Sequence, residues 1–192
     1  MKTSPPRIIS ITGFMGAGKT TVAQALARRL SCDLLDLDQL IETQTGRAPH
    51  SVIDEDGEPR FRELETQALR RALERATPRA GDTDTADAAT TPASVPLIIA
   101  LGGGTWTLER NRDLLSDADA FTVWLDAPFQ LCWQRIINQQ APRPLARDLE
   151  GARRLYEARR ASYSLARMHL RVTAETTPQA LAERIATALS SC

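Results

Sequence analysis

The stretch GFMGAGKTT, from Gly13 to Thr21, combines three glycines with one lysine and two threonines. Residues 13–20 fit the pattern G-x-x-x-x-G-K-T, in which glycines let successive backbone N–H groups wrap phosphate oxygens. The lysine can reach the β- and γ-phosphates, and the hydroxyl that follows it can bind Mg²⁺. We expect a nucleoside triphosphate to be bound here by Gly13, Gly16, Ala17, Gly18, Lys19, Thr20 and Thr21.

A pair of aspartates in the stretch LLDLDQLIE is the second candidate for chemistry. Asp36 and Asp38 are two residues apart, so on a strand they would share one face. Beside a phosphate loop, such a pair is suited to holding Mg²⁺ through water and to orienting a hydroxyl nucleophile. The plainer alternative is that the two aspartates cap a helix.

Three further stretches contain arginines or glycines that are candidates for binding a ligand. Arg62 lies near the start of a helical pattern, and Arg159 lies four residues before Tyr163 in EARRASY. The run Gly102–Gly104 ends an apolar segment, and consecutive glycines weaken a strand unless its backbone must meet a ligand closely. The stretch APRPLARD, which contains Arg143, has the composition of a lid that closes over phosphates.

The spacing of apolar residues predicts the elements that must position these groups. Short apolar runs predict strands at residues 7–12, 32–38, 97–104, 120–126 and 169–173, and amphipathic stretches between them predict helices. Strands that alternate with helices form a parallel sheet covered on both faces, and ligands bind outside the carboxyl ends of its strands. We therefore expect a three-layer α/β/α fold with a central five-stranded parallel sheet.

Composition excludes several classes of protein. The 192 residues suffice for one domain, and 24 Lys and Arg balance 24 Asp and Glu, so no net charge favours nucleic acid or an anionic membrane. Three cysteines without CxxC spacing and two histidines argue against a zinc site or a disulfide framework. No apolar run approaches the roughly 18 residues of a membrane span, and none resembles a signal peptide. We expect a cytoplasmic monomer.

Residues 77–95 differ from the rest of the chain. This segment, TPRAGDTDTADAATTPASV, is rich in Thr, Ala, Asp and Pro and offers almost nothing to bury. We predict a flexible surface insertion within a single domain that spans residues 1–192.

The phosphate loop alone leaves several enzyme classes open. A GTPase of this loop class would need a base-reading motif such as N-K-x-D, which is absent, and a motor ATPase needs a longer chain. The motifs GFMGAGKT, D-L-D, F-R, G-G-G, R-P-L and R-x-x-x-Y occur here in the order seen in shikimate kinases. From about Arg7 to the last helix, apart from residues 77–95, the chain resembles this family.

The resemblance implies ATP-dependent phosphorylation of the shikimate 3-hydroxyl, with Mg²⁺ as the cofactor. Arg143, in a lid at residues 138–149, would join the loop in binding ATP. Thr20 and, through water, Asp36 would hold the metal. The catalytic residues would be Lys19, Asp38 and Arg143. The substrate would be bound by Asp38, Arg62, Gly103, Gly104 and Arg159.

The chain departs from the family's pattern in places. The lid lacks a longer glycine-containing segment, and no proline precedes the tyrosine in RRASY. Arg135 is a candidate for stacking on adenine, and Trp106 is either a core residue or a residue that alters substrate fit. Two alternatives stay open: a gluconate kinase-like small-molecule kinase, and a non-catalytic relative that acts as a binding module.

Overall fold

The computed structural model describes residues 6–76, 96–138, 145 and 148–190. Within these ranges one sheet contains β1 (Ile8–Thr12), β2 (Leu34–Asp36), β3 (Leu97–Ala100), β4 (Phe121–Asp126) and β5 (Met168–Arg171). The strands are ordered β2-β3-β1-β4-β5, and every neighbouring pair is parallel. The expected five-stranded parallel sheet is confirmed.

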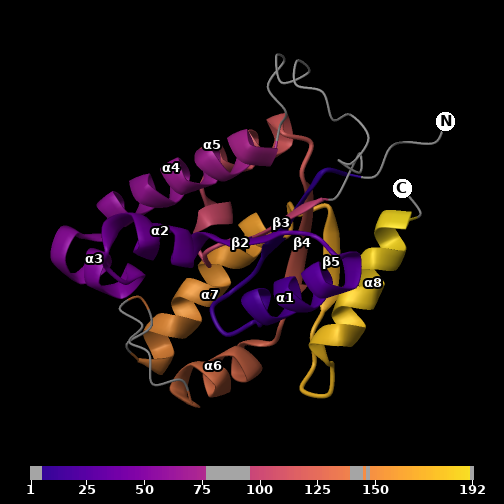
Figure 1. Cartoon of the computed structure of the whole chain (residues 1–192). Helices are drawn as coiled ribbons and strands as arrows, with labels where there is room; N and C mark the ends of the chain where they lie inside the picture. Colours follow the sequence, from indigo (N-terminus) through magenta and orange to yellow (C-terminus); the bar gives the residue numbers. More distant parts are fainter. Residues whose placement is uncertain (1–5, 77–95, 139–144, 146–147, 191–192) are drawn as a thin grey trace, which may run out of the picture.

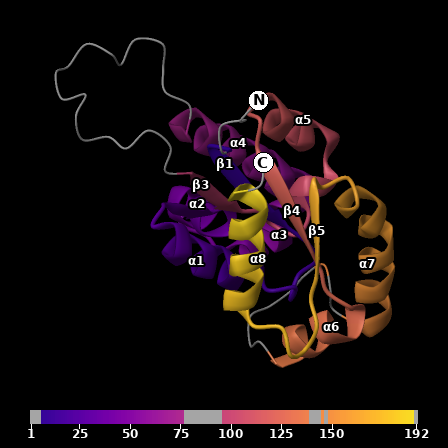
Figure 2. The same cartoon turned by 90° about the vertical axis from the view of Figure 1, so that its right-hand side faces the viewer.

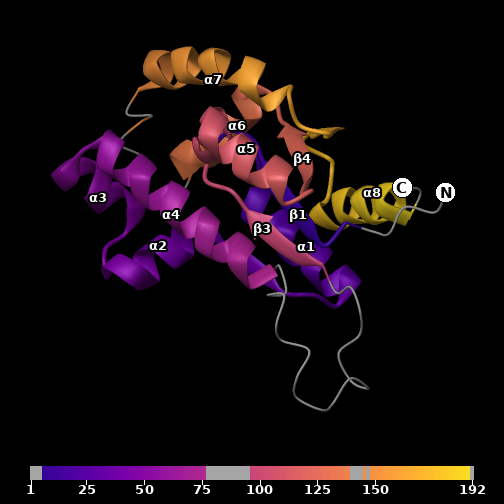
Figure 3. The ribbon, with the colours of Figure 1, turned by 90° about the horizontal axis from the view of Figure 1, so that it is seen from above.

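Helices cover both faces of this sheet. They are α1 (Lys19–Leu30), α2 (Leu37–Thr45), α3 (Pro49–Asp56), α4 (Glu58–Ala76), the 3₁₀ turn η1 (Thr105–Thr107), α5 (Glu109–Asp117), α6 (Phe129–Asn138), α7 (Leu149–Tyr163) and α8 (Pro178–Ser190). Figure 2 shows α1 and α8 side by side on one face and α7 on the other, which is the predicted three-layer arrangement. The helices α2, α3 and α4 form a lobe that extends away from the sheet (Figures 1 and 3).

The central strand β1 is buried along its whole length, as expected for a parallel strand covered on both faces. It lies between β3 and β4, and its residue Ile11 is aligned with Ala100 of β3 and Val123 of β4. Because β1 and β3 end next to each other, the glycine loop after β1 and the triple glycine after β3 emerge at the same edge. The sheet therefore brings together two motifs that are nearly 90 residues apart in the sequence.

The second strand is shorter than predicted. It ends at Asp36, and α2 begins at Leu37. The Asp36 carboxylate accepts a hydrogen bond from the backbone N–H of Asp38 at 3.0 Å, so it caps α2. The prediction that Asp36 and Asp38 share one face of a strand is therefore wrong, because Asp38 lies in the first turn of a helix.

Two predicted segments fall mostly outside the described residues: the insertion at 77–95 and the lid at 138–149, including Arg143. In the part of the chain that the structure does describe, no helix combines the length and apolar character needed to cross a membrane.

Candidate active site

The phosphate loop joins β1 to α1 and depends on glycine for its path. Gly16 has a φ of 77°, and a Cβ at this position would stand 2.6 Å from the carbonyl oxygen of Cys132. A side chain is excluded there by both the dihedral angle and the contact. Gly18 is the N-cap of α1, so the N-terminus of that helix opens directly onto the loop. Such a helix end attracts anions through its unpaired N–H groups and its dipole.

Arg135 braces this loop from α6. Its Nη1 donates to the carbonyl oxygens of Gly16 at 3.0 Å and Ala17 at 3.2 Å. The N–H of Gly18 points the opposite way, away from Arg135, because a carbonyl and the N–H that follows it in one peptide unit are antiparallel. Lys19 crosses the loop and donates from Nζ to the carbonyl oxygen of Phe14 at 3.1 Å. The loop is therefore held in shape by one contact within it, from Lys19, and by Arg135 from α6.

A cavity of about 380 Å³ lies beside the loop. Of the predicted ATP-binding residues that the structure describes, Gly16, Ala17, Gly18, Lys19, Thr20 and Thr21 line it, whereas Gly13 does not. Asp36, Asp38, Gly103 and Arg135 also line the cavity. Val172, Thr176, Pro178 and Leu181, from the segment between β5 and the first turns of α8, line the cavity as well.

The predicted metal residues are in direct contact. Thr20 donates from Oγ1 to Oδ2 of Asp36 at 2.7 Å, at the point where α1 meets the end of β2. A hydroxyl and a carboxylate are hard oxygen ligands of the kind that Mg²⁺ prefers, and Mg²⁺ commonly takes only one or two protein ligands beside water and phosphate. This pair fits such an ion. In the described residues, no group of three or more His, Cys, Asp and Glu is placed to hold a metal.

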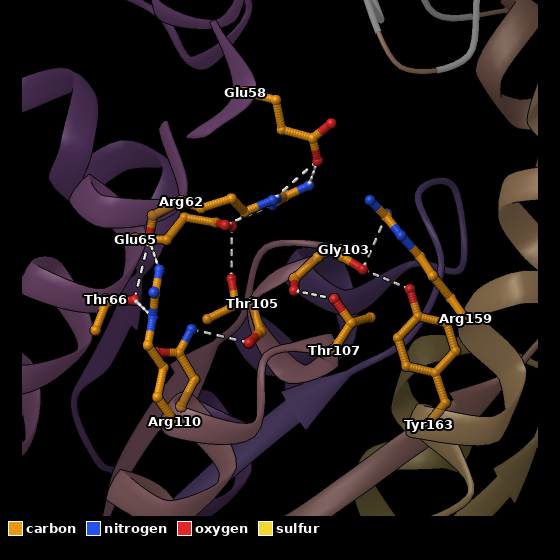
Figure 4. A network of polar contacts seen from close by, with 12 residues as sticks. Glu58, Arg62, Glu65, Thr66, Gly103, Thr105, Thr107, Arg110, Arg159 and Tyr163 are labelled. Atoms are coloured by element: carbon orange, nitrogen blue, oxygen red, sulfur yellow. Dashed lines mark hydrogen bonds and ion pairs between the residues drawn. The ribbon is translucent and has the colours of Figure 1, made fainter. Parts of the chain in front are cut away.

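On the acceptor side, Arg62 projects from α4 and is paired with two carboxylates (Figure 4). Its Nε and Nη2 both donate to Oε1 of Glu58, at 3.0 and 2.6 Å, and its Nη1 donates to Oε2 of Glu65 at 2.5 Å. The side chain of Glu65 is 1% exposed, while that of Glu58 is 44% exposed. The other oxygen of Glu65 accepts from the hydroxyl of Thr105 at 2.6 Å, which ties α4 to the turn after β3.

The second predicted arginine, Arg159, approaches from α7. Its Nη1 donates to the carbonyl oxygen of Gly103 at 3.1 Å, and the hydroxyl of Tyr163 donates to the same oxygen. Burial raises the pKa of Tyr163 to about 12, so this hydroxyl keeps its proton at physiological pH. Figure 4 shows Arg62 and Arg159 on opposite sides of Gly103.

The triple glycine allows these side chains to come close to the backbone. A Cβ on Gly104 would stand 2.2 Å from Nη1 of Arg62, and a Cβ on Gly102 would stand 2.3 Å from Oε1 of Glu65 and 3.2 Å from Oδ1 of Asp38. The glycines therefore form a surface on which Arg62, Glu65 and Asp38 all rest. The sequence predicted that a ligand meets this backbone closely; the groups that approach it in the structure are side chains of the protein itself, and the contact with a ligand stays a prediction.

The sequence reasoning missed several contacts. It did not assign partners to Arg62, although Glu58 and Glu65 lie four residues before and three after it, the spacing of neighbours on a helix surface. It left two interpretations of Trp106, which is a core residue: it is 6% exposed, and its Nε1 donates to the carbonyl oxygen of Ser162. Arg143 lies outside the described residues.

Comparison with known proteins matches this chain to shikimate kinases. The family model described as shikimate kinase matches residues 15–78 and 79–190. A shikimate kinase of Ruegeria pomeroyi is 32% identical over 96% of this chain and 86% of its own length, and one of Cereibacter sphaeroides is 34% identical over 96% and 83%.

Among solved structures, the shikimate kinase of Acinetobacter baumannii in complex with shikimate is 29% identical, with a TM-score of 0.79 over 97% of this chain and 94% of that one. Fold, site geometry and sequence similarity agree, and the chain belongs to the shikimate kinase family.

Proposed function

We propose that this protein transfers the γ-phosphoryl group of ATP to the 3-hydroxyl of shikimate. The observation that carries the proposal is the placement of two arginines, Arg62 and Arg159, around the triple glycine at the same sheet edge as the phosphate loop. Shikimate is a carboxylate at one end and a triol at the other. An arginine pair suits the first end, and Asp38, beside Gly102, suits the second.

On the nucleotide side, the loop amides and Lys19 would bind the phosphates of ATP. The N-terminus of α1 adds its partial positive charge. Val172, Pro178 and Leu181 give the far end of the cavity an apolar lining, which suits the flat face of a base. We expect Arg143 to contribute a further positive charge from the lid.

Thr20 and Asp36 would hold Mg²⁺, Thr20 through its hydroxyl and Asp36 through water. The ion would supply positive charge at the β- and γ-phosphates. The Thr20–Asp36 hydrogen bond holds the two side chains next to each other, as this arrangement requires.

On the acceptor side, Arg62 and Arg159 would hold the carboxylate of shikimate, with the backbone of Gly103 and Gly104 beside its ring. Asp38 would accept a hydrogen bond from the attacking hydroxyl and fix its direction. Phosphoryl transfer passes through a loose, anionic transition state, so alignment and positive charge matter more than a strong base. Asp38 is therefore an orienting group first and a proton acceptor second.

The proposal is tested by ADP release in a coupled assay with shikimate, gluconate and nucleoside monophosphates as separate acceptors. We expect turnover with shikimate and a phosphate ester in the product by ³¹P NMR. Turnover with gluconate at a comparable kcat/KM, or ADP release that does not depend on an acceptor, would overturn the proposal. The Lys19→Met variant gives the background rate.

We also propose that the protein acts as a single-domain monomer in the cytoplasm. The spacing of its cysteines, which does not indicate a disulfide framework, and the use of ATP support the cytoplasm. Light scattering on a size-exclusion column measures the mass directly, and a dimer at micromolar concentration would contradict the monomer.

A further inference from the structure

The two carboxylates on Arg62 differ sharply in how firmly they are held. Glu65 is buried, and both its oxygens are bonded, one to Arg62 and one to Thr105. Glu58 is nearly half exposed, and only one of its oxygens contacts Arg62. Removing Glu65 from its site would leave a buried charge unpaired, whereas Glu58 can turn into water. The contact with Glu58 is thus the exchangeable one.

Glu58 occupies one of the edges of the Arg62 guanidinium that can bind a carboxylate. It accepts from Nε and Nη2, the two donors along one edge of the guanidinium, where a carboxylate can be bound by two parallel hydrogen bonds. Figure 4 shows the Glu58 carboxylate at the outer end of the Arg62 side chain. A substrate carboxylate that used this edge would have to displace Glu58.

The charges around the site also favour displacement of Glu58 by a substrate carboxylate. Two negative carboxylates already surround the positive charge of Arg62. Within the described residues, Arg159 forms no ion pair with a carboxylate, and its guanidinium donates to a neutral carbonyl. The four groups sum to zero, and Asp38, beside Gly102, adds a negative charge to the acceptor side. The carboxylate of a substrate would increase this negative charge unless Glu58 leaves, since anions close together repel one another.

We propose that Glu58 is an internal stand-in for the substrate carboxylate. It pairs with Arg62 when the acid site is empty, and an incoming organic acid displaces it into solvent while Glu65 stays in place. This inference rests on the proposed function and adds to it that affinity for the acid is set by a competition within the protein. Glu58 holds the guanidinium in place before binding, and it excludes weaker anions that cannot compete with a carboxylate tethered four residues away.

The test is the affinity for shikimate in Glu58→Gln, measured as KM and, without ATP, as the Kd by calorimetry. The Glu58 side of this ion pair is partly exposed to water, which weakens the pair, so its removal is expected to lower both constants by about two- to five-fold. The KM for ATP and kcat are expected to change less than that. Glu58→Ala, which removes the acceptor altogether, is expected to gain at least as much affinity as Glu58→Gln.

The matched control is Glu63→Gln. Glu63 lies on the same helix, carries the same charge and is similarly exposed, but it pairs with Arg60 instead. Its replacement is expected to leave the shikimate Kd unchanged. An equal gain in Glu63→Gln would mean that the effect is one of general charge and would overturn the inference.

A double variant distinguishes competition from other effects. If Glu58 acts through Arg62, the gain from Glu58→Gln must vanish in an Arg62→Ala background. A weaker or unchanged shikimate affinity in Glu58→Gln would show that Glu58 braces Arg62 or is inert, and would overturn the inference while leaving the proposed function standing. A wild-type protein that neither binds nor phosphorylates shikimate would instead overturn the proposed function. Thermal unfolding of each variant verifies that it is folded.

Discussion

The nucleotide-binding site and the acceptor site of the protein are built from different kinds of groups. The nucleotide side is mostly backbone: glycine dihedral angles, the start of α1, and carbonyls braced by Arg135. The acceptor side is mostly charged side chains, Arg62 and Arg159, which come from different helices and meet over a glycine surface. Backbone donors are fixed by the fold, whereas charged side chains must be held by partners that can be exchanged. The nucleotide side is therefore rigid, whereas the side chains of the acceptor side can rearrange.

The largest expected effect falls on the nucleotide side. Lys19→Met removes the only side-chain charge of the phosphate loop at residues 13–21. We expect kcat to fall by at least about a thousandfold, because loss of one donor aimed at the transition state already costs about 100- to 1000-fold. Single-turnover phosphoryl transfer measures this, with shikimate Kd as the control that should not move. Retained turnover would remove the loop from the mechanism.

The second-largest effect distinguishes the acceptor side from the nucleotide side. Arg62→Ala is expected to raise the KM for shikimate by roughly a hundredfold, because truncation of one partner of a buried charge pair costs about 2–5 kcal/mol. ATP affinity should stay nearly constant, because Arg62 does not line the nucleotide cavity. Initial-rate kinetics with each substrate varied in turn gives both constants. Equal weakening of both substrates would contradict the carboxylate role.

A pair of glycine variants sharpens the comparison. In Gly16→Ala the new methyl group would meet the backbone of Cys132, and in Gly104→Ala it would meet the Arg62 guanidinium. We expect about a tenfold rise in the KM for ATP in the first variant and for shikimate in the second, since overpacking costs about 1–3 kcal/mol. If either variant affects both substrates alike, the two halves are not independent.

The smallest effect comes from two tyrosines on α7. Tyr163 donates to Gly103, while Tyr156, also buried and seven residues earlier, donates to the carbonyl oxygen of Ala127 at 3.0 Å. Each Tyr→Phe variant should lose about 1 kcal/mol of unfolding free energy. Only Tyr163→Phe should also raise the KM for shikimate, by about two- to five-fold. Denaturant unfolding and kinetics measure the two quantities. A KM change in Tyr156→Phe would indicate a general effect of helix α7.

The nucleotide side could be predicted from the sequence because its requirements are local. A glycine pattern between an apolar run and an amphipathic helix indicates both the backbone path and the ligand. The structure places Thr20 and Asp36 in contact, and their role as metal ligands stays a prediction. The five parallel strands followed from periodicity in the same way. For the boundary near Asp36 the sequence left two alternatives, a shared strand face and a helix cap, because the two compete there by small free energies; the structure shows that Asp36 is the cap.

The acceptor side was harder to predict because it depends on tertiary contacts. Arg62 and Arg159 were named through a family resemblance, and nothing in the local sequence predicts that they flank the same glycines. The double pairing of Arg62 and the shared carbonyl of Gly103 exist only once α4, α7 and the turn after β3 are packed together. The roles of these residues stay predictions, to be decided by the variants above.

The single oxygen of Gly103 that accepts from both Arg159 and Tyr163 has a consequence for how α7 can change. The two residues are four positions apart, about one helical turn, so both side chains lie on the same face of α7 and can contact the same oxygen. An insertion of one residue between them would rotate one relative to the other by about 100° and separate them. The interval from 159 to 163 therefore has a fixed length, and natural or engineered variation in the length of α7 must fall outside it.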